Sequence, residues 1–117
     1  MARIDRAHSQ NSEVHLATPV VVSGYSESGA PFNEYTYTVI VSGNGCLIKL
    51  RTPVGNEQLL LLTNVKTEEN IIGRVAIRVT GENGSSHVKV SFVSPSPQFW
   101  RLTFPPENSN PTSREEE

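Results

Sequence analysis

The sequence predicts an all-β fold in which six antiparallel strands form a barrel or a sandwich. Six short runs are rich in apolar residues, and most alternate apolar and polar residues with the period of two expected of a strand. Clusters of glycine, proline, asparagine and serine separate these runs at nearly regular spacing. The chain shows neither a long 3.6-residue period nor an internal repeat, and its 117 residues suffice for one domain with its own core.

The N-terminal part of the chain predicts an arm, a strand and a loop. Residues 1–13 are polar, with almost no apolar periodicity, and are predicted to form a flexible arm. The alternation over Leu16–Val22 predicts the first strand, and Pro19, which has no backbone N–H, places that part of the strand at an edge or a bulge. Gly24–Pro31 is rich in turn-forming residues and is predicted to be a loop.

The central feature of the sequence is a hairpin predicted over Thr36–Leu50. One face of its first run carries Tyr37, Val39 and Val41. One face of its second run carries Cys46, Ile48 and Leu50. The turn between them is Ser42, Gly43, Asn44 and Gly45, in which the glycines permit positive φ and Asn44 tolerates it. Successive amides in such a turn can form an anion-binding nest; the alternative is a hairpin turn without a ligand.

Three further strands are predicted in the second half of the chain. The continuous apolar run Leu59–Leu62 indicates a strand buried on both faces, with a short helix as the alternative. The longest clean alternation covers Ile71–Val79. Glu82–Gly84 marks a hairpin turn before the last strand, Val88–Phe92.

The alternation also predicts which side chains form the core. The positions expected to be buried are Val20, Val22, Val39, Val41, Ile48, Val75, Ile77, Val90 and Phe92. After the last strand, a single helical turn is predicted around Pro97, and an aromatic plug of Phe99, Trp100 and Phe104 is predicted to close one end of the core. The domain is therefore expected to span residues 14–106, followed by a disordered acidic tail over 107–117.

Composition and motifs exclude several classes of function. A net charge of −2 and a pI near 5.9 argue against a general DNA- or RNA-binding protein, and no apolar run is long enough to insert into a membrane. The three histidines lack the spacing of a metal site, and no cofactor motif is present. The single cysteine is expected to be a buried thiol, which favours the cytoplasm. Arg74 and Arg78 are expected on one solvated strand face. Because the sequence also shows neither paired carboxylates nor an exposed cysteine beside a base, an enzyme is not expected.

The order of these segments resembles the PilZ domain family of bacteria. The matching segments are Pro19–Gly24, Thr38–Ile48, Arg74–Ile77, Val88–Phe92 and Pro97–Pro106. The resemblance implies a six-stranded antiparallel β-barrel that binds cyclic di-GMP on its outer surface. It also implies two ligand motifs, an Arg-x-x-x-Arg segment before the first strand and an Asp/Asn-x-Ser-x-x-Gly segment that runs into a turn.

The chain departs from both motifs that the resemblance implies. Ser42 and Gly45 match the second motif, whereas Ile40 stands at the Asp/Asn position. The arginine positions of the first motif fall near Ser9 and Glu13, and a glutamate repels a phosphate. The candidate ligand-binding residues are therefore those of the turn, Ser42, Gly43, Asn44 and Gly45, with Arg3 and Arg6 of the arm as substitute cations.

Two hypotheses from different classes follow. In the first, the chain is a PilZ-type receptor that binds cyclic di-GMP, weakly because two charge-assisted contacts are missing. In the second, the ligand motif is degenerate and the domain serves as a protein–protein interaction or scaffold module. Neither hypothesis requires a metal or another cofactor.

Overall fold

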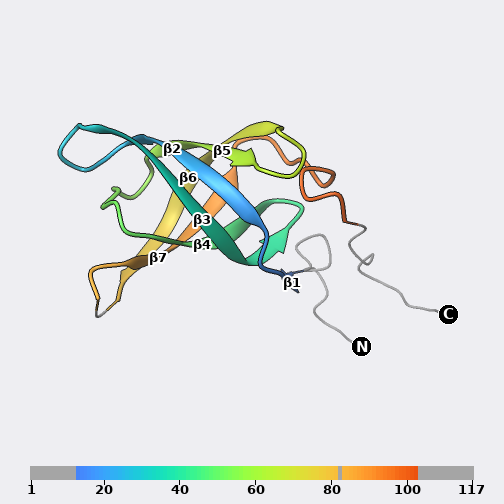
Figure 1. Ribbon diagram of the computed structural model, residues 1–117, viewed down its shortest axis with the longest axis horizontal. Helices are drawn as coiled ribbons and strands as arrows, with labels where there is room; N and C mark the ends of the chain where they lie inside the picture. Colours follow the sequence, from blue (N-terminus) through green and yellow to red (C-terminus); the bar gives the residue numbers. More distant parts are fainter. Residues whose placement is uncertain (1–12, 82, 103–117) are drawn as a thin grey trace, which may run out of the picture.

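The computed structural model describes residues 13–81 and 83–102, which form a closed six-stranded antiparallel barrel with one short additional strand (Figure 1). The strands are β1 (Val14–His15), β2 (Pro19–Tyr25), β3 (Pro31–Ser42), β4 (Gly45–Leu50), β5 (Leu59–Asn64), β6 (Asn70–Thr80) and β7 (Ser86–Phe92). Around the barrel the order is β3-β2-β5-β6-β7-β4, and pairing of β4 with β3 closes it. The predicted all-β barrel is confirmed. The additional strand β1, which pairs with the end of β3, was not predicted.

β2 and β3 differ in extent from their predictions, and β5 differs in burial. β2 covers Pro19–Tyr25 rather than Leu16–Val22, so Gly24 and Tyr25 belong to a strand and not to the predicted loop. β3 begins at Pro31, five residues before the expected start, and its first half pairs with β2 in a long hairpin. In this half Glu34 is half-buried, and its carboxylate accepts hydrogen bonds from the Arg51 and Thr52 amides. β5 is the expected strand, but Leu59 at its start is exposed, so the run is not buried on both faces throughout.

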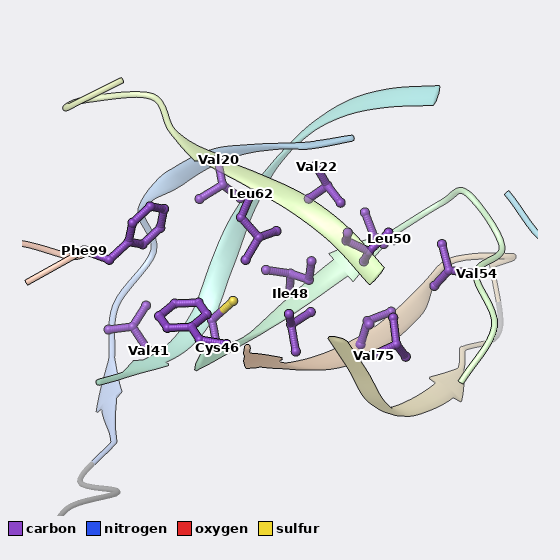
Figure 2. Packing of buried hydrophobic residues seen from close by; sticks show 14 of the residues in the cluster. Val20, Val22, Val41, Cys46, Ile48, Leu50, Val54, Leu62, Val75 and Phe99 are labelled. Atoms are coloured by element: carbon purple, nitrogen blue, oxygen red, sulfur yellow. The ribbon is translucent and has the colours of Figure 1, made fainter. Parts of the chain in front are cut away.

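The core is a single cluster of apolar side chains inside the barrel (Figure 2). Its largest fully buried members are Ile48, Leu50, Leu60, Leu62, Val20, Val22, Val41, Val54, Val75, Val88 and Val90. Figure 2 shows Phe99 and Val54 at opposite ends of this cluster. Most of the predicted core is confirmed because regular alternation places every second residue inside a strand.

A β-bulge in β3 overturns the predicted faces of that strand. The pairing with β4 shifts register between Thr38 and Ile40, so that Val39 is an extra residue and the alternation reverses there. Thr38 therefore points inward and is buried, whereas Tyr37 is exposed and Val39 is only half-buried. The Thr38 hydroxyl donates to the Leu16 carbonyl at 2.6 Å and accepts from the Thr18 amide at 2.9 Å, which satisfies it inside the barrel.

A second bulge, in β6, makes the prediction for Ile77 wrong. The pairing with β7 shifts register between Val75 and Ile77, so Val75 is buried and Ile77 is 55% exposed. The same shift separates the two arginines that were expected to share a face. Arg74 stays on the outer face, whereas Arg78 now lies opposite the buried Val88.

Arg78 uses its inward position to close one end of the barrel. Its Nη1 atom donates to the Val54 carbonyl at 2.8 Å and to Glu27 Oε2 at 3.1 Å. These contacts join the β2–β3 and β4–β5 loops to β6. The polar residue Arg78 can occupy an inward position of β6 because its guanidinium has hydrogen-bond partners at the barrel end.

The aromatic plug closes the other end, as predicted for Phe99 and Trp100. Two consecutive turns hold the segment, with the Phe99 amide bonded to the Ser96 carbonyl and the Arg101 amide to the Gln98 carbonyl. The Phe99 ring packs edge-on to Phe92 at 5.5 Å and to Trp100 at 4.8 Å between centroids. The Asn64 side-chain amide donates to the Phe99 carbonyl at 2.8 Å. Phe104, the predicted arm before residue 13 and the tail over 107–117 lie outside the described residues.

The reversed alternation in β6 predicts very different costs for two isoleucine substitutions. Ile48→Ala should reduce the free energy of unfolding by about 2–5 kcal/mol, because Ile48 is fully buried in the cluster. Ile77→Ala should cost less than about 1 kcal/mol, because its side chain is largely in solvent. Urea denaturation of both variants measures the difference. Equal losses would show that β6 has no bulge and that Ile77 faces the core.

Candidate functional site

The β3–β4 turn lies at the plug end of the barrel and is held in place by the segment that follows β7. The Ser42 carbonyl accepts a hydrogen bond from Trp100 Nε1 at 2.9 Å. The Gly43 carbonyl accepts from the Ser96 amide at 3.1 Å, and the Asn44 carbonyl accepts from the Phe92 amide at 2.7 Å. Two of these carbonyls bind the segment after β7 and the third binds the last residue of β7, so the conformation of the turn depends on both.

The turn does not have the backbone conformation that was expected of a nest. Positive φ among the described glycines occurs at Gly29 and Gly84, so Gly43 and Gly45 adopt ordinary negative values. The Asn44 amide points to the Ser42 hydroxyl, 3.2 Å away. Gly43, Asn44 and Gly45 therefore do not adopt the positive φ that they were expected to permit, and the turn matches the alternative of a hairpin turn without a nest.

Gly45 is required by packing rather than by its φ angle. A Cβ atom at this position would lie 2.0 Å from the Val90 carbonyl oxygen and 3.2 Å from the Ser91 Cα atom. The backbones of β4 and β7 approach so closely here that a side chain has no space. Gly43 differs, since a Cβ there would meet Pro97 at an ordinary 3.5 Å.

A groove of about 510 Å³ opens beside the turn on the outer face of β3, β4 and β7, and we call it the turn groove. Its lining includes the side chains of Glu13, Ile40, Ser42, Leu47, Lys89 and Ser91. The structure thus brings together Ser42, Gly45 and two of the three residues at which the sequence departs from the PilZ motifs, Ile40 and Glu13. The bulge at Val39 leaves Ile40 opposite Leu47, so two aliphatic side chains form part of the wall.

The described lining of the turn groove lacks the arginines that the PilZ resemblance implies. Glu13 contributes an exposed carboxylate, and Lys89 is the only cation among the described lining residues. Arg3, Arg6 and Ser9 lie outside the described residues, so their place relative to the groove stays a prediction. Lys89 was not predicted as a site residue. It lies beside Leu47 because β4 pairs with β7, and the local sequence does not reveal that pairing.

Cys46 is a buried thiol, as expected. Burial raises the pKa of this thiol from its ordinary value of 9.0 to about 12, so the sulfur stays protonated at neutral pH. A protonated, enclosed thiol is a poor nucleophile.

The described parts of the chain contain neither a candidate metal site nor a candidate membrane-spanning helix. No group of three His, Cys, Asp or Glu side chains there could hold a metal ion. Within the same ranges, no helix has the length and apolar character needed to cross a membrane.

A second, more open groove of about 850 Å³ lies at the opposite end of the barrel, and we call it the tyrosine groove. It is lined by Tyr35, Tyr37, Lys49 and Arg51, together with Asn83 and Ser85 of the β6–β7 loop. Sequence reasoning missed this site because it assigned Tyr37 to the face of Val39 and Val41. The two tyrosines, two residues apart and so on one face of a strand, could have indicated this site in the sequence.

Comparison with known proteins identifies the fold. No family model matches the chain, and no curated protein sequence matches it. Among solved structures, the chain resembles *K. pneumonia* MrkH in its complex with c-di-GMP, with a TM-score of 0.50 and 17% identity over 73% of this chain. MrkH in its apo state gives a TM-score of 0.47 and 16% identity over 79% of the chain. The match covers less than half of the MrkH chain, 44% and 45% in the two cases.

The two glycines of the turn should respond differently to substitution. Gly45→Ala should destabilise the fold by about 1–3 kcal/mol or more, because the new methyl group would collide with the β7 backbone. Gly43→Ala should change stability by less than about 1 kcal/mol, since its φ is negative and its surroundings leave room. Thermal and urea denaturation check both. Tolerance of Gly45→Ala would mean that this glycine is not fixed by packing.

The buried thiol predicts a loss of stability at alkaline pH. Between pH 9 and about 12 the unfolded chain releases the Cys46 proton while the folded chain retains it, so stability should fall as pH rises through this range. The measurement is the free energy of unfolding against pH for the native chain minus that for Cys46→Ala, which cancels other titrating groups. A difference that does not change with pH, or rapid labelling of the native thiol by a maleimide at neutral pH, would contradict this burial.

Proposed function

We propose that this chain is a non-enzymatic PilZ-type binding module of bacterial signalling whose cyclic di-GMP site is degenerate, so that nucleotide binding is weak or lost and the module acts on a protein partner. The barrel fold, its likeness to MrkH and the order of the PilZ-like segments support this proposal. The inaccessible thiol supports a binding role over a thiol-based enzyme and is consistent with the cytoplasm.

The strongest support for the proposal is that Ile40 and Glu13 both line the turn groove. An Asp or Asn at residue 40 would offer hydrogen-bonding oxygen to a guanine edge, whereas the sec-butyl group offers none. An arginine at residue 13 would form charge-assisted hydrogen bonds to a phosphate, whereas a carboxylate repels it. Both changes weaken the same ligand in the same groove.

The remaining groups of the turn groove compensate little for these losses. The Ser42 hydroxyl already accepts from the Asn44 amide, and the three turn carbonyls accept from Phe92 of β7 and from Ser96 and Trp100 of the following segment. Lys89 can attract a phosphate but cannot form the forked contact of a guanidinium. Missing two charged hydrogen bonds of roughly 1.5–3 kcal/mol each lowers affinity by two decades or more. Any residual binding relies on Lys89, the turn and the arm residues Arg3 and Arg6.

A protein-interaction role is favoured by the exposed side chains of the outer faces. Tyr35, Tyr37, Ile77 and Val79 are all more than half exposed. Aromatic residues are enriched where proteins meet, and a β-barrel holds such residues on a rigid surface. The module would then keep the barrel as a scaffold and use these faces for its partner.

Calorimetric titration with cyclic di-GMP tests the degenerate site. The native chain should bind weakly or not at all at physiological salt, and residual binding should weaken further with added salt. The variant Ser9→Arg, Glu13→Arg, Ile40→Asp should bind about a hundredfold more tightly, because it restores the charged and polar contacts. Arg3→Ala with Arg6→Ala should remove residual binding by the native chain.

A matched control separates restored chemistry from added charge. Ser94→Arg, Glu68→Arg, Ile72→Asp makes the same substitutions at exposed positions that do not line the turn groove, and should leave affinity unchanged. A native chain that binds with a dissociation constant below about 1 μM, unchanged by deletion of residues 1–8, would refute the degenerate site.

A further inference from the structure

The tyrosine groove combines three features that no part of the PilZ resemblance accounts for, beginning with two exposed aromatic rings. Tyr35 is 57% and Tyr37 is 51% exposed, and their rings meet edge to face with centroids 5.7 Å apart and planes 81° apart. Exposed tyrosines side by side on a rigid strand present an amphipathic surface at small entropic cost. The pair lies outside the core cluster, and exposed aromatic rings of this kind point to a ligand or partner.

The second feature is a local positive charge on a chain whose net charge is −2. Lys49 and Arg51 line the groove, and His87 is the partner of Lys49 in the β4–β7 pairing. Neither Lys49 nor Arg51 forms an ion pair with a residue that the structure describes. Among the described lining residues the acid is Glu34, whose carboxylate accepts hydrogen bonds from two amides and the Thr52 hydroxyl, so two cations stand against one anion. The groove therefore attracts anionic groups.

The third feature is a pair of exposed apolar side chains on β6, Ile77 and Val79, which lie outside the groove lining and which we call the β6 rim. The bulge turns Ile77 and Val79 outward, where they are 55% and 60% exposed. Val79 lies opposite His87, which in turn lies opposite Lys49, so one row of outward residues crosses three strands. Figure 1 shows the β2–β3 and β6–β7 hairpins projecting from the same end of the barrel.

We propose that this face, Tyr35, Tyr37, Lys49, Arg51, Ile77 and Val79, docks an acidic segment of a partner protein that carries aliphatic or aromatic anchors. The charge complementarity selects acidic residues, while the tyrosines and the β6 rim bury the anchors. Single-stranded nucleic acid fits less well. Rings set at 81° cannot both stack on successive bases, and exposed isoleucine and valine add nothing to base stacking. The inference rests on the protein partner of the proposed function and assigns its docking surface.

Selection from a random peptide library against the full chain tests this docking face. Enriched peptides should combine Asp or Glu with aliphatic or aromatic residues and should bind more weakly as salt is added. Their affinity, measured by fluorescence anisotropy, should fall about tenfold or more for Lys49→Glu with Arg51→Glu, because attraction becomes repulsion at two positions. Tyr35→Thr with Tyr37→Thr should also weaken binding about tenfold or more, through loss of aromatic contact.

Controls distinguish this outcome from misfolding and from nucleotide binding. Lys66→Glu with Arg101→Glu reverses the same number of exposed cations elsewhere and should leave peptide affinity unchanged. Circular dichroism melting should show that both charge-reversed variants fold. Selection of no acidic peptides, equal binding by Lys49→Glu with Arg51→Glu, or tighter binding of oligothymidylate than of any peptide would overturn the docking face. None of these results alters the cyclic di-GMP titration, because Lys49 and Arg51 do not line the turn groove.

Discussion

Two β-bulges decide which side chains of this barrel face the core and which face solvent. Each inserts one residue into a long strand, and each reverses the alternation beyond it. The reversal carries Thr38 and Arg78 inward, where hydrogen bonds satisfy them, and leaves Ile40 and Ile77 on the outer surface. Closing six strands into a barrel requires such local bending. The residues that line both surface grooves therefore depend on the β-bulges that also allow the barrel to close.

Sequence reasoning succeeded wherever alternation was regular over a whole strand. Ile48 on β4 and Val90 on β7 were placed correctly because no bulge interrupts those strands. A bulge leaves no local hydrophobic signal, and Thr38 is stable inside only because Leu16 and Thr18, in the segment between β1 and β2, supply its hydrogen-bond partners. Local patterns carry no information about partners that distant in sequence.

The candidate site was accessible to sequence reasoning only in part, for a related reason. Ser42 and Gly45 were found because the motif is contiguous, but both are also required by the fold. Gly45 avoids the β7 backbone, and Ser42 caps its own turn and accepts the Trp100 indole through its carbonyl. A barrel can retain these two residues for packing after it has lost a nucleotide. Ile40 and Glu13 line the turn groove instead, so under the proposed function they, rather than Ser42 and Gly45, indicate how well a nucleotide would bind.

The pairing of β4 with β7 has a consequence for how the chain folds during synthesis. β4 leaves the ribosome well before β7, and the plug that fixes the β3–β4 turn follows later still. Until then the outer edge of β4 has unpaired backbone groups and the core has an open end. Pairing of strands so far apart also makes folding intrinsically slow. The nascent barrel therefore passes through an interval in which its central hairpin is open to aggregation or to a chaperone, and the arrival of Phe99 and Trp100 ends it.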